Sequence, residues 1–562
     1  MNTRQPRWQK LALHGILLGG SLLFLMPYVW LLGTSWKLDK EIQSDEFHLL
    51  PQAPIPRTAS PYIDERTFHI KPPEYVDADA WTGWMKAAAE DEIGRAVDAW
   101  IVEHPTEFPV RADRLRTELI EGVFGNVRAV LPVDTWATKE PVFRQAVSDA
   151  VADRMVSESF DQCYRYFALG KVLLKDRNYH IYDLTGKRRA EDTWCVTDGG
   201  AKIKTRVVSQ KEVGIVGYDF SKGDTFEIAS QFKLPVAWKD FKRLSISFRR
   251  DQTWHGLRVL LEINGRLYQS HSPKYLSEDN FWEASFQLPG PDDQRLAAKL
   301  YVLLDEIGQA PRYDHGPDTM RLRVVVSRSS TPQALWAKGT ENYKKVFEQV
   351  PFWRYLATSA FLAIANIVGT CLSCSMAAYA FARLRWPGRE LCFVLVLATL
   401  MIPPQVTMIP SFVIYRQLGW YNTLSPLWVP SWLAVNAFAI FLLRQAMRGL
   451  PRDLEDAATI DGCGYLRTYW HIALPLMRPT LAAISVFTFM YVWNDFMGPL
   501  IYVNDQRLYP ASLGLFSFMS GRENQFTLIM AASVVMTLPV VLVFFLLQRY
   551  FIQGVALTGM KG

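Results

Sequence analysis

Six long runs of apolar residues lie along the chain, one near its start and five in its last third. The first run, 11–36, contains no charged residue, and it is longer than the roughly 20 residues that a helix needs to cross a bilayer. The other five runs cover 355–382, 391–415, 427–443, 479–503 and 526–547. This pattern predicts six membrane-spanning helices with a long outer segment between the first and the second.

Basic residues are concentrated in every second linker between these runs, so they all lie on one side of the predicted membrane. Arg4, Arg7 and Lys10 precede the first run, and segments 383–389 and 444–478 are rich in arginine. Because basic loops stay on the cytoplasmic side, we expect a multi-pass protein of the bacterial inner membrane, with both termini cytoplasmic and residues 37–350 outside. A cleaved signal peptide is the alternative for the first run, but its apolar part exceeds the usual 7–15 or so residues.

The outer segment changes its pattern along its length. Apolar positions in 77–174 recur with helical period, whereas 202–328 holds short runs that are typical of strands, separated by turn signals. The predicted strands are 225–234, 244–248, 257–263, 281–286, 299–304 and 322–326, with a hairpin turn at Asn264-Gly265. The fold class is therefore expected to be an α-helical polytopic membrane protein with a large α+β extracytoplasmic insertion, which contains a β-sandwich.

Four domains follow from these patterns. The first is the N-terminal tail with the first span, and two extracytoplasmic subdomains come next, one helical and one like a β-sandwich. The last contains spans two to six and a long loop between the fourth and fifth spans. Their predicted bounds are 1–36, 37–176, 177–335 and 336–562, with the loop at 448–478.

Composition narrows the class of protein. The 562 residues are 49% hydrophobic and 13% aromatic, with a net charge of +6, which excludes disorder and gives no reason to expect nucleic acid as a partner. Cys163 and Cys195 are the two cysteines of the outer segment. They could form a disulfide in an oxidising compartment, and two buried thiols are the alternative.

Four residues of the spans are candidates for a translocation pathway. Pro403 and Pro404 favour a helix break where a span meets a cavity, although ordinary kinking is the alternative. Asn494 and Asp495 are the polar pair of the fifth span, and an intramembrane carboxylate is a candidate for function. An interfacial, structural role is the alternative for this pair. The sequence shows no recognisable catalytic or metal-ligand arrangement.

The outer strands are also rich in aromatic residues. Trp238, Trp254, Tyr268 and Trp282 suggest a platform on which a sugar ring could stack, or else part of the hydrophobic core. A second class of function therefore stays open, a membrane-anchored protein that binds or processes glycans. A third class, an ion-driven transporter, would require buried ionisable relays and inverted repeats.

The loop between the fourth and fifth spans carries the most information. Pro451 suits the first position of a helix, and Asp453 and Glu455 suit its positively polarised N-terminal end. Gly462 can end the helix in the left-handed conformation. A short helix of this kind, with a face of small residues, is suited to docking in a groove of a partner protein.

The same loop contains a family motif. Asp456-Ala457-Ala458 is followed after three residues by Gly462, and after nine more by Ile472-Ala473-Leu474-Pro475. This pattern resembles the Glu-Ala-Ala loop of the membrane subunits of ATP-binding-cassette importers, with Asp456 in place of the usual glutamate. Segments 377–389, 401–410 and 493–500 resemble the MalG-like carbohydrate-importer permeases. The resemblance covers 1–36 loosely and 340–562 well, but not 37–335.

The resemblance implies a permease subunit that forms half of a carbohydrate pathway and couples to a separate ATPase through residues 449–475. The coupling residues expected from it and from their neighbours are Glu455, Asp456, Ala457, Ala458, Asp461, Gly462, Leu474 and Pro475. The implied partners are a second permease subunit, two ATPase subunits, an extracytoplasmic sugar-binding protein and membrane lipid. ATP and Mg would be bound by the ATPase, since this chain has no GxxxxGK[ST] phosphate loop. The chain itself is not expected to be an enzyme.

Overall fold

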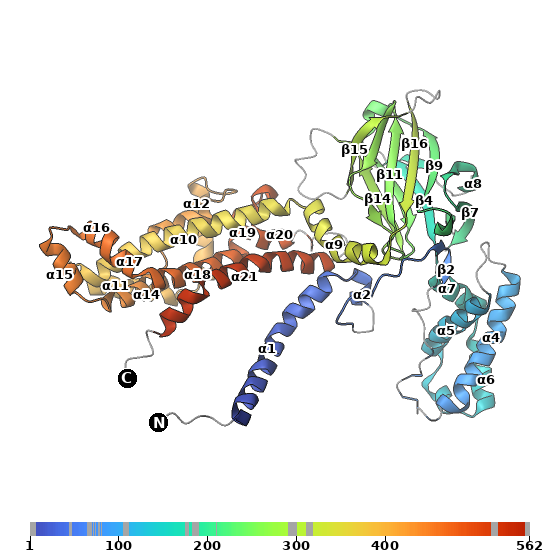
Figure 1. Ribbon diagram of the computed structural model, residues 1–562, viewed down its shortest axis with the longest axis horizontal. Coiled ribbons are helices and arrows are strands. Elements are labelled where there is room, and N and C mark those ends of the chain that lie inside the picture. The colour runs from blue at the N-terminus through green and yellow to red at the C-terminus, as the bar shows by residue number, and fades with distance from the viewer. Residues whose placement is uncertain are drawn as a thin grey trace. The chain divides into compact units, whose positions relative to one another are not determined.

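The computed structural model describes residues 7–43, 48–63, 70, 72–73, 75–76, 79, 81–104, 112–174, 179–182, 190–208, 211–289, 301–310, 318–516, 518 and 526–556. The chain divides into two compact units (Figure 1). We call Met1–Gln52 together with Gly339–Gly562 the membrane unit. We call Ala53–Arg295 together with Leu300–Lys338 the insert unit.

The membrane unit holds the long apolar helices. Four helices among the described residues are long and apolar enough to cross a membrane: Leu13–Ser35 within α1 (Arg7–Ser35), α10 (Phe352–Arg383), Ser425–Arg448, and Phe526–Leu546 within α21 (Phe526–Ala556). Two bent pairs also pass this test, Arg389–Met401 with Pro404–Gln417 and Tyr465–Leu476 with Arg478–Asn494. The number of such helices is therefore four, or up to six if each bent pair is one span. Each predicted span overlaps one of these elements.

Proline chemistry explains the sharper of the two bends. The axes of Arg389–Met401 and of α12 (Pro404–Gln417) meet at 101°. Pro403 stands at the N-cap of α12 in extended conformation, and Pro404 occupies its first turn. A proline disfavours the helical conformation of the residue before it and lacks the N–H that a helix interior needs. Two successive prolines therefore end one helix and start the next, and the predicted break is confirmed.

Small residues let the central helices approach closely. α10 packs against α14 (Ala437–Arg448) and α18 (Arg478–Asn494), as Figure 1 shows. Cys374 and Ala378 of α10 are fully buried in this contact, beside Leu443 of α14. Lipid is as apolar as the side chains, so burial of apolar surface does little to hold membrane helices together. Close van der Waals packing does so instead, and small side chains permit it.

The insert unit is built on a 14-stranded sheet. Its order along the main path is β1-β8-β4-β10-β14-β15-β12-β11-β16-β9-β6. The strands of this path are β1 (Ala59–Ser60), β4 (Phe167–Leu174), β6 (Trp194–Asp198), β8 (Lys211–Asp219), β9 (Thr225–Lys233), β10 (Arg243–Arg249), β11 (Gly256–Ile263), β12 (Arg266–Ser270), β14 (Phe281–Gln287), β15 (Val302–Gln309) and β16 (Thr319–Ser327). Neighbours are antiparallel except β14 and β15, which pair in parallel only at Phe286–Val302 and Gln287–Leu303.

That short parallel pairing divides the path into two halves that share one hydrophobic core. Ile246 and Phe248 of β10 belong to one half, and Val259 of β11 and Val324 of β16 belong to the other. All four side chains are fully buried in the same cluster. Alternate residues of β16 are buried, as expected for a strand with one face on a core.

The six predicted strands correspond to β9, β10, β11, β14, β15 and β16. The hairpin prediction is confirmed as well: Asn264 and Gly265 join β11 to β12 with φ of 49° and 72°. Two successive positive φ values define the type I′ turn that suits a two-residue hairpin. The subdomain boundary expected at 176 lies within the sheet, because β1 and β4 come from the segment that was expected to be helical.

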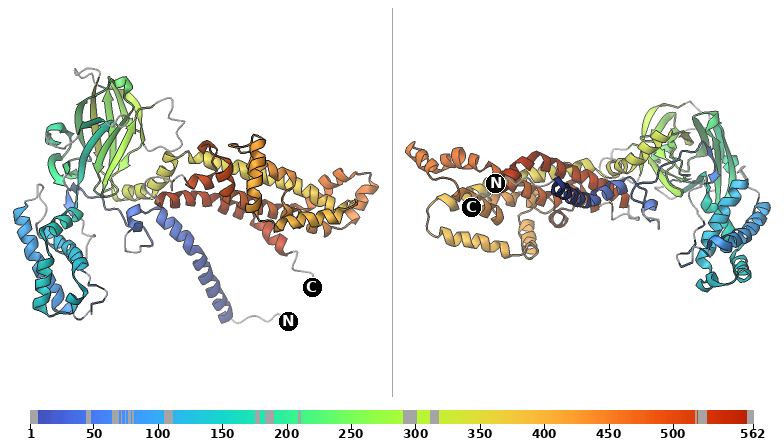
Figure 2. Two further views of the ribbon diagram at one scale, coloured as in Figure 1. Left: turned by 180° about the vertical axis from the view of Figure 1, so that it is seen from behind. Right: turned by 60° about the horizontal axis from the view of Figure 1, so that its bottom comes forward.

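Helices form the rest of the insert unit and bury an aromatic core. They are η1 (Trp81–Met85), α4 (Lys86–Glu103), α5 (Ala112–Val130), α6 (Glu140–Ala150) and α7 (Asp153–Cys163), drawn in blue and cyan in Figure 2. Trp81 packs on Phe124 and Trp136, and Trp136 packs on Phe143. The helical periodicity predicted for this region is confirmed up to Cys163, where α7 gives way to strands.

The two cysteines of the insert unit are thiols and not a disulfide. Cys163 is buried at the end of α7, where its Sγ donates to the Glu118 carbonyl at 3.7 Å. Cys195 is exposed on β6, and its Sγ donates to the Ala229 carbonyl at 3.3 Å. The possible bridge is not formed because α7 leads into one half of the sheet whereas β6 is the edge strand of the other.

The aromatic residues considered as a sugar platform are core residues instead. Trp254 is 2% exposed and Tyr268 is 5% exposed. Trp238 and Trp282 are partly buried and pack against the core of the sheet. A stacking platform requires exposed ring faces, which these side chains do not offer together.

One buried imidazole joins the two ends of the insert unit. His255 Nε2 lies 2.7 Å from the Arg57 carbonyl, and Nδ1 accepts from the Ser329 N–H at 3.1 Å. The ring is therefore neutral, with its proton on Nε2. Burial lowers the pKa of His255, although the nearby Asp251 carboxylate opposes this shift.

This geometry predicts acid sensitivity of the insert unit. Below about pH 6.5, the ordinary pKa of histidine, the unfolded chain binds a proton that the folded His255 resists, so the free energy of unfolding falls as the pH falls. The protection factor of the Ser329 amide in the full-length protein, which is the ratio of its intrinsic to its observed exchange rate, should fall as the pH falls over this range. His255→Gln preserves a donor and an acceptor and should remove the pH dependence. His271→Gln, which removes an exposed imidazole, is the control. An equal protection factor above and below pH 6.5 in the wild type would contradict this assignment.

Candidate functional site

The loop between the fourth and fifth predicted spans folds into the expected short helix. α15 runs from Asp453 to Ile460, with Asp453, Glu455 and Asp456 in its first turn. Acidic residues there stabilise the helix through its dipole. Pro451 lies one residue before the N-cap, Arg452, so the helix begins two residues later than predicted.

Gly462 ends α15 as predicted. Its φ is +79°, a conformation that strains residues with a Cβ. The Gly462 N–H donates to the Thr459 carbonyl at 3.1 Å, and the Cys463 N–H donates to the Ala458 carbonyl at 2.9 Å. These two bonds form a Schellman motif, which satisfies carbonyls at the helix end and turns the chain sharply.

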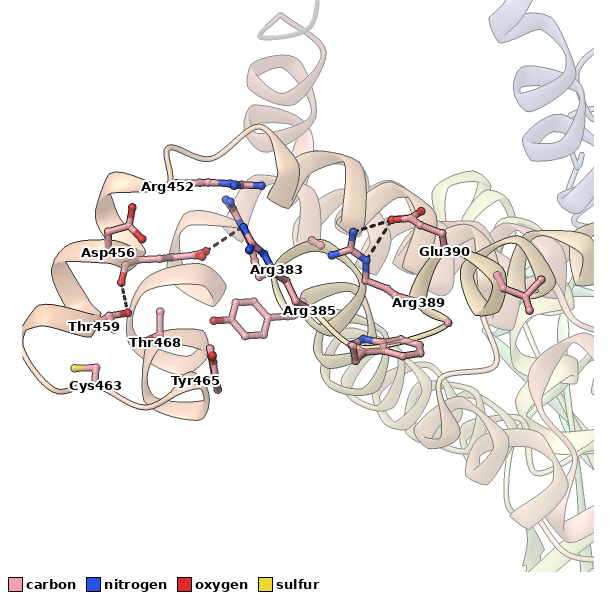
Figure 3. A pocket seen from close by; sticks show the side chains of 16 residues that line it. Arg383, Arg385, Arg389, Glu390, Arg452, Asp456, Thr459, Cys463, Tyr465 and Thr468 are labelled. Atoms are coloured by element: carbon pink, nitrogen blue, oxygen red, sulfur yellow. Dashed lines mark hydrogen bonds and ion pairs between the residues drawn. The ribbon is translucent and has the colours of Figure 1, made fainter.

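A single arginine connects α15 to the membrane helices (Figure 3). Arg383 is the last residue of α10, and its side chain is only 6% exposed. Its Nη2 donates to the carbonyls of Met447 and Leu450, at 2.6 and 2.9 Å, and its Nε lies 3.0 Å from Glu455 Oε1. One guanidinium thus holds the end of α14, the following loop and the first turn of α15 against α10.

The partner carboxylate is partly withdrawn from water. Burial raises the pKa of Glu455, and the positive charge of Arg383 opposes that rise. Loss of one member of such a pair destabilises the folded chain more than loss of both, because the remaining charge then lacks its partner. Glu455 was predicted from its place beside the family motif, whereas Arg383 was not, because it lies at the end of a different helix, α10.

The expected coupling residues differ in exposure. Asp456, Ala457, Asp461 and Gly462 are exposed, whereas the Ala458 side chain is buried within this chain at 5% exposure. Leu474 and Pro475 are half-buried in α17 (Leu474–Leu476). The surface that α15 offers to a partner therefore includes Ala457 but not the methyl group of Ala458.

Three exposed apolar side chains, one at the end of α15 and two shortly after it, were not identified from the sequence. Ile460 is 86% exposed, Tyr465 is 74% exposed and Leu466 is 68% exposed. Apolar residues in an otherwise polar loop were the signal that could have found them. Large exposed apolar side chains grouped at one site mark a surface for interaction.

A pocket of about 660 Å³ adjoins α15. Its walls come from the end of α10, the linking residues 384–388, the first turn of α11 (Arg389–Ala398), and α15 with the segment after it. Figure 3 shows its charged side chains, among them Arg385, Arg389, Arg452 and Asp456.

A second cavity, of about 940 Å³, lies among the membrane helices. Of the four candidate pathway residues, Pro404 and Asp495 line this cavity, and Pro403 and Asn494 do not. Asn494 is exposed, and its Nδ2 donates to the Met490 carbonyl at 2.8 Å.

Asp495 lies at the break between α18 and α19 (Met497–Tyr502), within the predicted fifth span. Its Oδ1 accepts from the Gly498 N–H at 3.1 Å. Asp495 therefore makes a structural hydrogen bond and also lines the cavity, and its role in a translocation pathway stays a prediction. Further polar residues of this cavity were not singled out from the sequence, among them Asn366, Thr370, Asn436, Thr488 and Tyr491.

The described residues contain no group of three or more His, Cys, Asp or Glu side chains placed to hold a metal ion. The two cavities are lined by hydroxyl, amide, carboxylate and guanidinium groups together with apolar side chains. Such groups bind a ligand through hydrogen bonds, charge and apolar contact.

Known proteins resemble the membrane unit. Residues 353–557 match the family described as binding-protein-dependent transport system inner membrane component. The arabinooligosaccharides transport system permease protein AraQ of Halalkalibacterium halodurans is 34% identical over 247 residues, which are 44% of this chain and 87% of that protein. The sn-glycerol-3-phosphate transport system permease protein UgpE of Yersinia pestis bv. Antiqua is 36% identical over 222 residues, 39% of this chain and 76% of that protein.

Among solved structures, a chain of a bacterial ABC transporter involved in the import of the acidic polysaccharide alginate is similar to this chain. The TM-score is 0.34 at 24% identity, and the match covers 37% of this chain and 79% of that one.

The contacts of Arg383 predict a measurable coupling within the loop. Arg383→Met should leave Glu455 without its cation and two carbonyls without their donor, and hydrogen exchange in 453–463 should rise by the equivalent of about 1–2 kcal/mol. The double variant Arg383→Met/Glu455→Met should lose less than the sum of the two single variants. Arg467→Met, at an exposed arginine of α16 (Tyr465–Thr468), is the control. Strict additivity of the two losses would show that the pair does not act together.

Proposed function

This chain belongs to the family of binding-protein-dependent transport system inner membrane components, and from this premise we propose that its cargo is a carbohydrate. It is a permease subunit of an ATP-binding-cassette importer. The ATPase is a separate subunit, and the chain is not itself an enzyme. The name of one relative, an arabinooligosaccharides permease, supports the carbohydrate class, and the other relative is named for a phosphorylated polyol, sn-glycerol-3-phosphate.

α15 and the residues around it are proposed to dock on the ATPase. This proposal rests on one observation. α15 is an exposed helix with a well-defined end, and Arg383 connects it to the end of a membrane helix. A docked element must be held firmly by its own chain if movement of the motor is to reach the membrane helices. The exposed Ile460 and Tyr465 offer apolar contact area, and Asp456 offers charge. ATP and Mg are proposed to bind to the ATPase alone.

We further propose six spans, with each bent pair crossing once. Both termini and α15 then lie in the cytoplasm, because the arginine-rich segments 383–389 and 444–478 share one side. The insert unit lies in the periplasm, and its two half-sheets with a common core form a β-sandwich. An extracytoplasmic sugar-binding protein delivers the cargo on that side.

The 940 Å³ cavity is proposed as this subunit's half of the pathway. Tyr491, which lines it, is 73% exposed, and Met497 is 52% exposed. A wall so open requires a second permease subunit to complete it. Asp495 and the hydroxyl and amide groups around the cavity offer hydrogen bonds to sugar hydroxyls, and Pro404 fixes the break at its edge.

The competing function, a membrane-anchored protein that binds or processes glycans, gains no support from the insert unit. The aromatic residues that suggested it pack into the core. A single membrane-spanning helix would also be enough to anchor such a protein, and the presence of α15 would then be unexplained.

Two substitutions test the docking role. Asp456→Arg reverses an exposed charge, and we expect uptake to fall at least about tenfold, the equivalent of 1.4 kcal/mol at the interface. Asp456→Glu, which has the usual residue of the family, should keep uptake near wild type. Membrane insertion and folding should be unchanged in both, as measured by proteolysis. Normal uptake by Asp456→Arg would exclude this residue from the interface.

Gly462 provides a second, independent test. A Cβ at this position meets no atom within 4 Å, so any effect of Gly462→Ala comes from its positive φ, at about 1 kcal/mol. Gly462→Trp adds bulk on the exposed side and should reduce uptake much further. Gly464→Ala, at a glycine with ordinary φ of −75°, is the matched control. If the alanine and tryptophan variants behaved alike, backbone strain and not docking would explain the loss.

A further inference from the structure

The pocket beside α15 lies at the ends of two membrane helices. α10 ends at Arg383 and α11 begins at Arg389, and the residues between them form one wall. In the orientation proposed above, on which this inference rests, that wall lies at the cytoplasmic surface of the bilayer. The pocket is therefore within reach of lipid headgroups.

Positive charge exceeds negative charge around this pocket. Six arginines stand in or beside it, at positions 383, 385, 389, 444, 448 and 452, against the acids Glu390, Glu455 and Asp456. Glu390 is shared, because it pairs with Arg389 at 2.8 Å and Arg444 at 2.9 Å and lies 3.6 Å from Arg448. Glu455 is engaged by Arg383. The excess charge is therefore cationic.

Two of the arginines that line the pocket are available to a ligand. Arg385 and Arg452 are exposed, and neither forms an ion pair with another residue in the part of the chain that the structure describes. Of the three acids that line the pocket, Asp456 alone has no ion pair within the described residues. It lies on α15, which forms a different wall from residues 384–388. Guanidinium groups bind phosphate through two parallel hydrogen bonds, so this side of the pocket favours a phosphate group.

The membrane side of the same pocket is apolar. Trp386 and Leu391 line it, and Leu391 is 65% exposed. Val394 and Leu395 follow on the same face of α11 at i+3 and i+4, each 59% exposed. An acyl chain can lie along this stripe while its headgroup stays at the arginines. A soluble anion would use only the arginines.

We propose that the pocket between the 384–388 link and α15 binds the phosphate headgroup of an anionic phospholipid of the cytoplasmic leaflet. Basic pockets between membrane helices on this side of the bilayer are suited to such headgroups. Arg385 and Arg452 bind the phosphate, Trp386 lies at the interface, and the acyl chains follow Leu391, Val394 and Leu395. Because α15 supplies one wall, the bound lipid braces the coupling helix against α10 and α11.

The test uses the complete transporter in nanodiscs of phosphatidylethanolamine, with or without phosphatidylglycerol. Lipid retained by the permease is measured by native mass spectrometry. Each charge removed should weaken phosphatidylglycerol binding about fivefold, so the double variant Arg385→Gln/Arg452→Gln should weaken it roughly 25-fold. Arg354→Gln removes an exposed arginine at the other end of α10 and should leave retention unchanged. Maleimide labelling of Cys463, which lines the pocket, should slow when phosphatidylglycerol is present, whereas labelling of Cys195 should not.

Further measurements separate the possible occupants. Inorganic phosphate in place of the lipid should neither slow Cys463 labelling nor displace phosphatidylglycerol, and if it did both, the ligand would be a free anion. Cross-linking of the Arg385→Cys variant to the ATPase through its new thiol, unaffected by phosphatidylglycerol, would show that protein fills the pocket. Unchanged lipid retention in the double variant would also overturn the proposal. Uptake by the Asp456 variants reports separately on docking, so the lipid site can fail while the coupling role stands.

Discussion

The arrangement of α15 and the loop before it depends on one buried guanidinium. Arg383 donates to carbonyls at the end of α14 and in the loop that follows, and it faces Glu455 in the first turn of α15. Without this group the two carbonyls would lose a donor and the carboxylate its ion-pair partner in a partly desolvated place, at a cost of about 1–3 kcal/mol for each buried group left unsatisfied. These contacts tie the first turn of α15 to the end of α10. The pocket beside it exists because the same contact holds α15 close to the membrane helices.

The preferences of neighbouring residues made several local features of the chain predictable from the sequence. The acidic first turn of α15, its end at Gly462, the break at Pro403-Pro404 and the hairpin at Asn264-Gly265 each follow from the preferences of a few adjacent residues. The apolar runs located the membrane helices for the same reason, since the bilayer fixes their length.

Contacts between distant residues were not predictable in this way. Arg383 and Glu455 are 72 positions apart, and the partners of Glu390 include Arg444, 54 positions later. The burial of Ala458 and the exposure of Ile460 depend on how α15 rests on the rest of the chain. The early strands β1 and β4 were missed for different reasons: β1 is two residues long and its partner β8 lies far along the chain, and β4 directly follows a helical region and pairs with strands that come after it, β5, β8 and β10. Periodicity reports one element at a time, whereas a sheet and a pocket are assembled from several.

The imidazole of His255 has a consequence for how such a chain can arise. It touches both Arg57, near the first residue of the insert unit, and Ser329, near its last strand. A domain whose two ends lie close together can be inserted between two neighbouring residues of a loop without changing the distance between them. Domains with adjacent termini are tolerated as insertions for this reason. An importer subunit can thus acquire or lose a whole folded body in one genetic event and keep its membrane helices as they were.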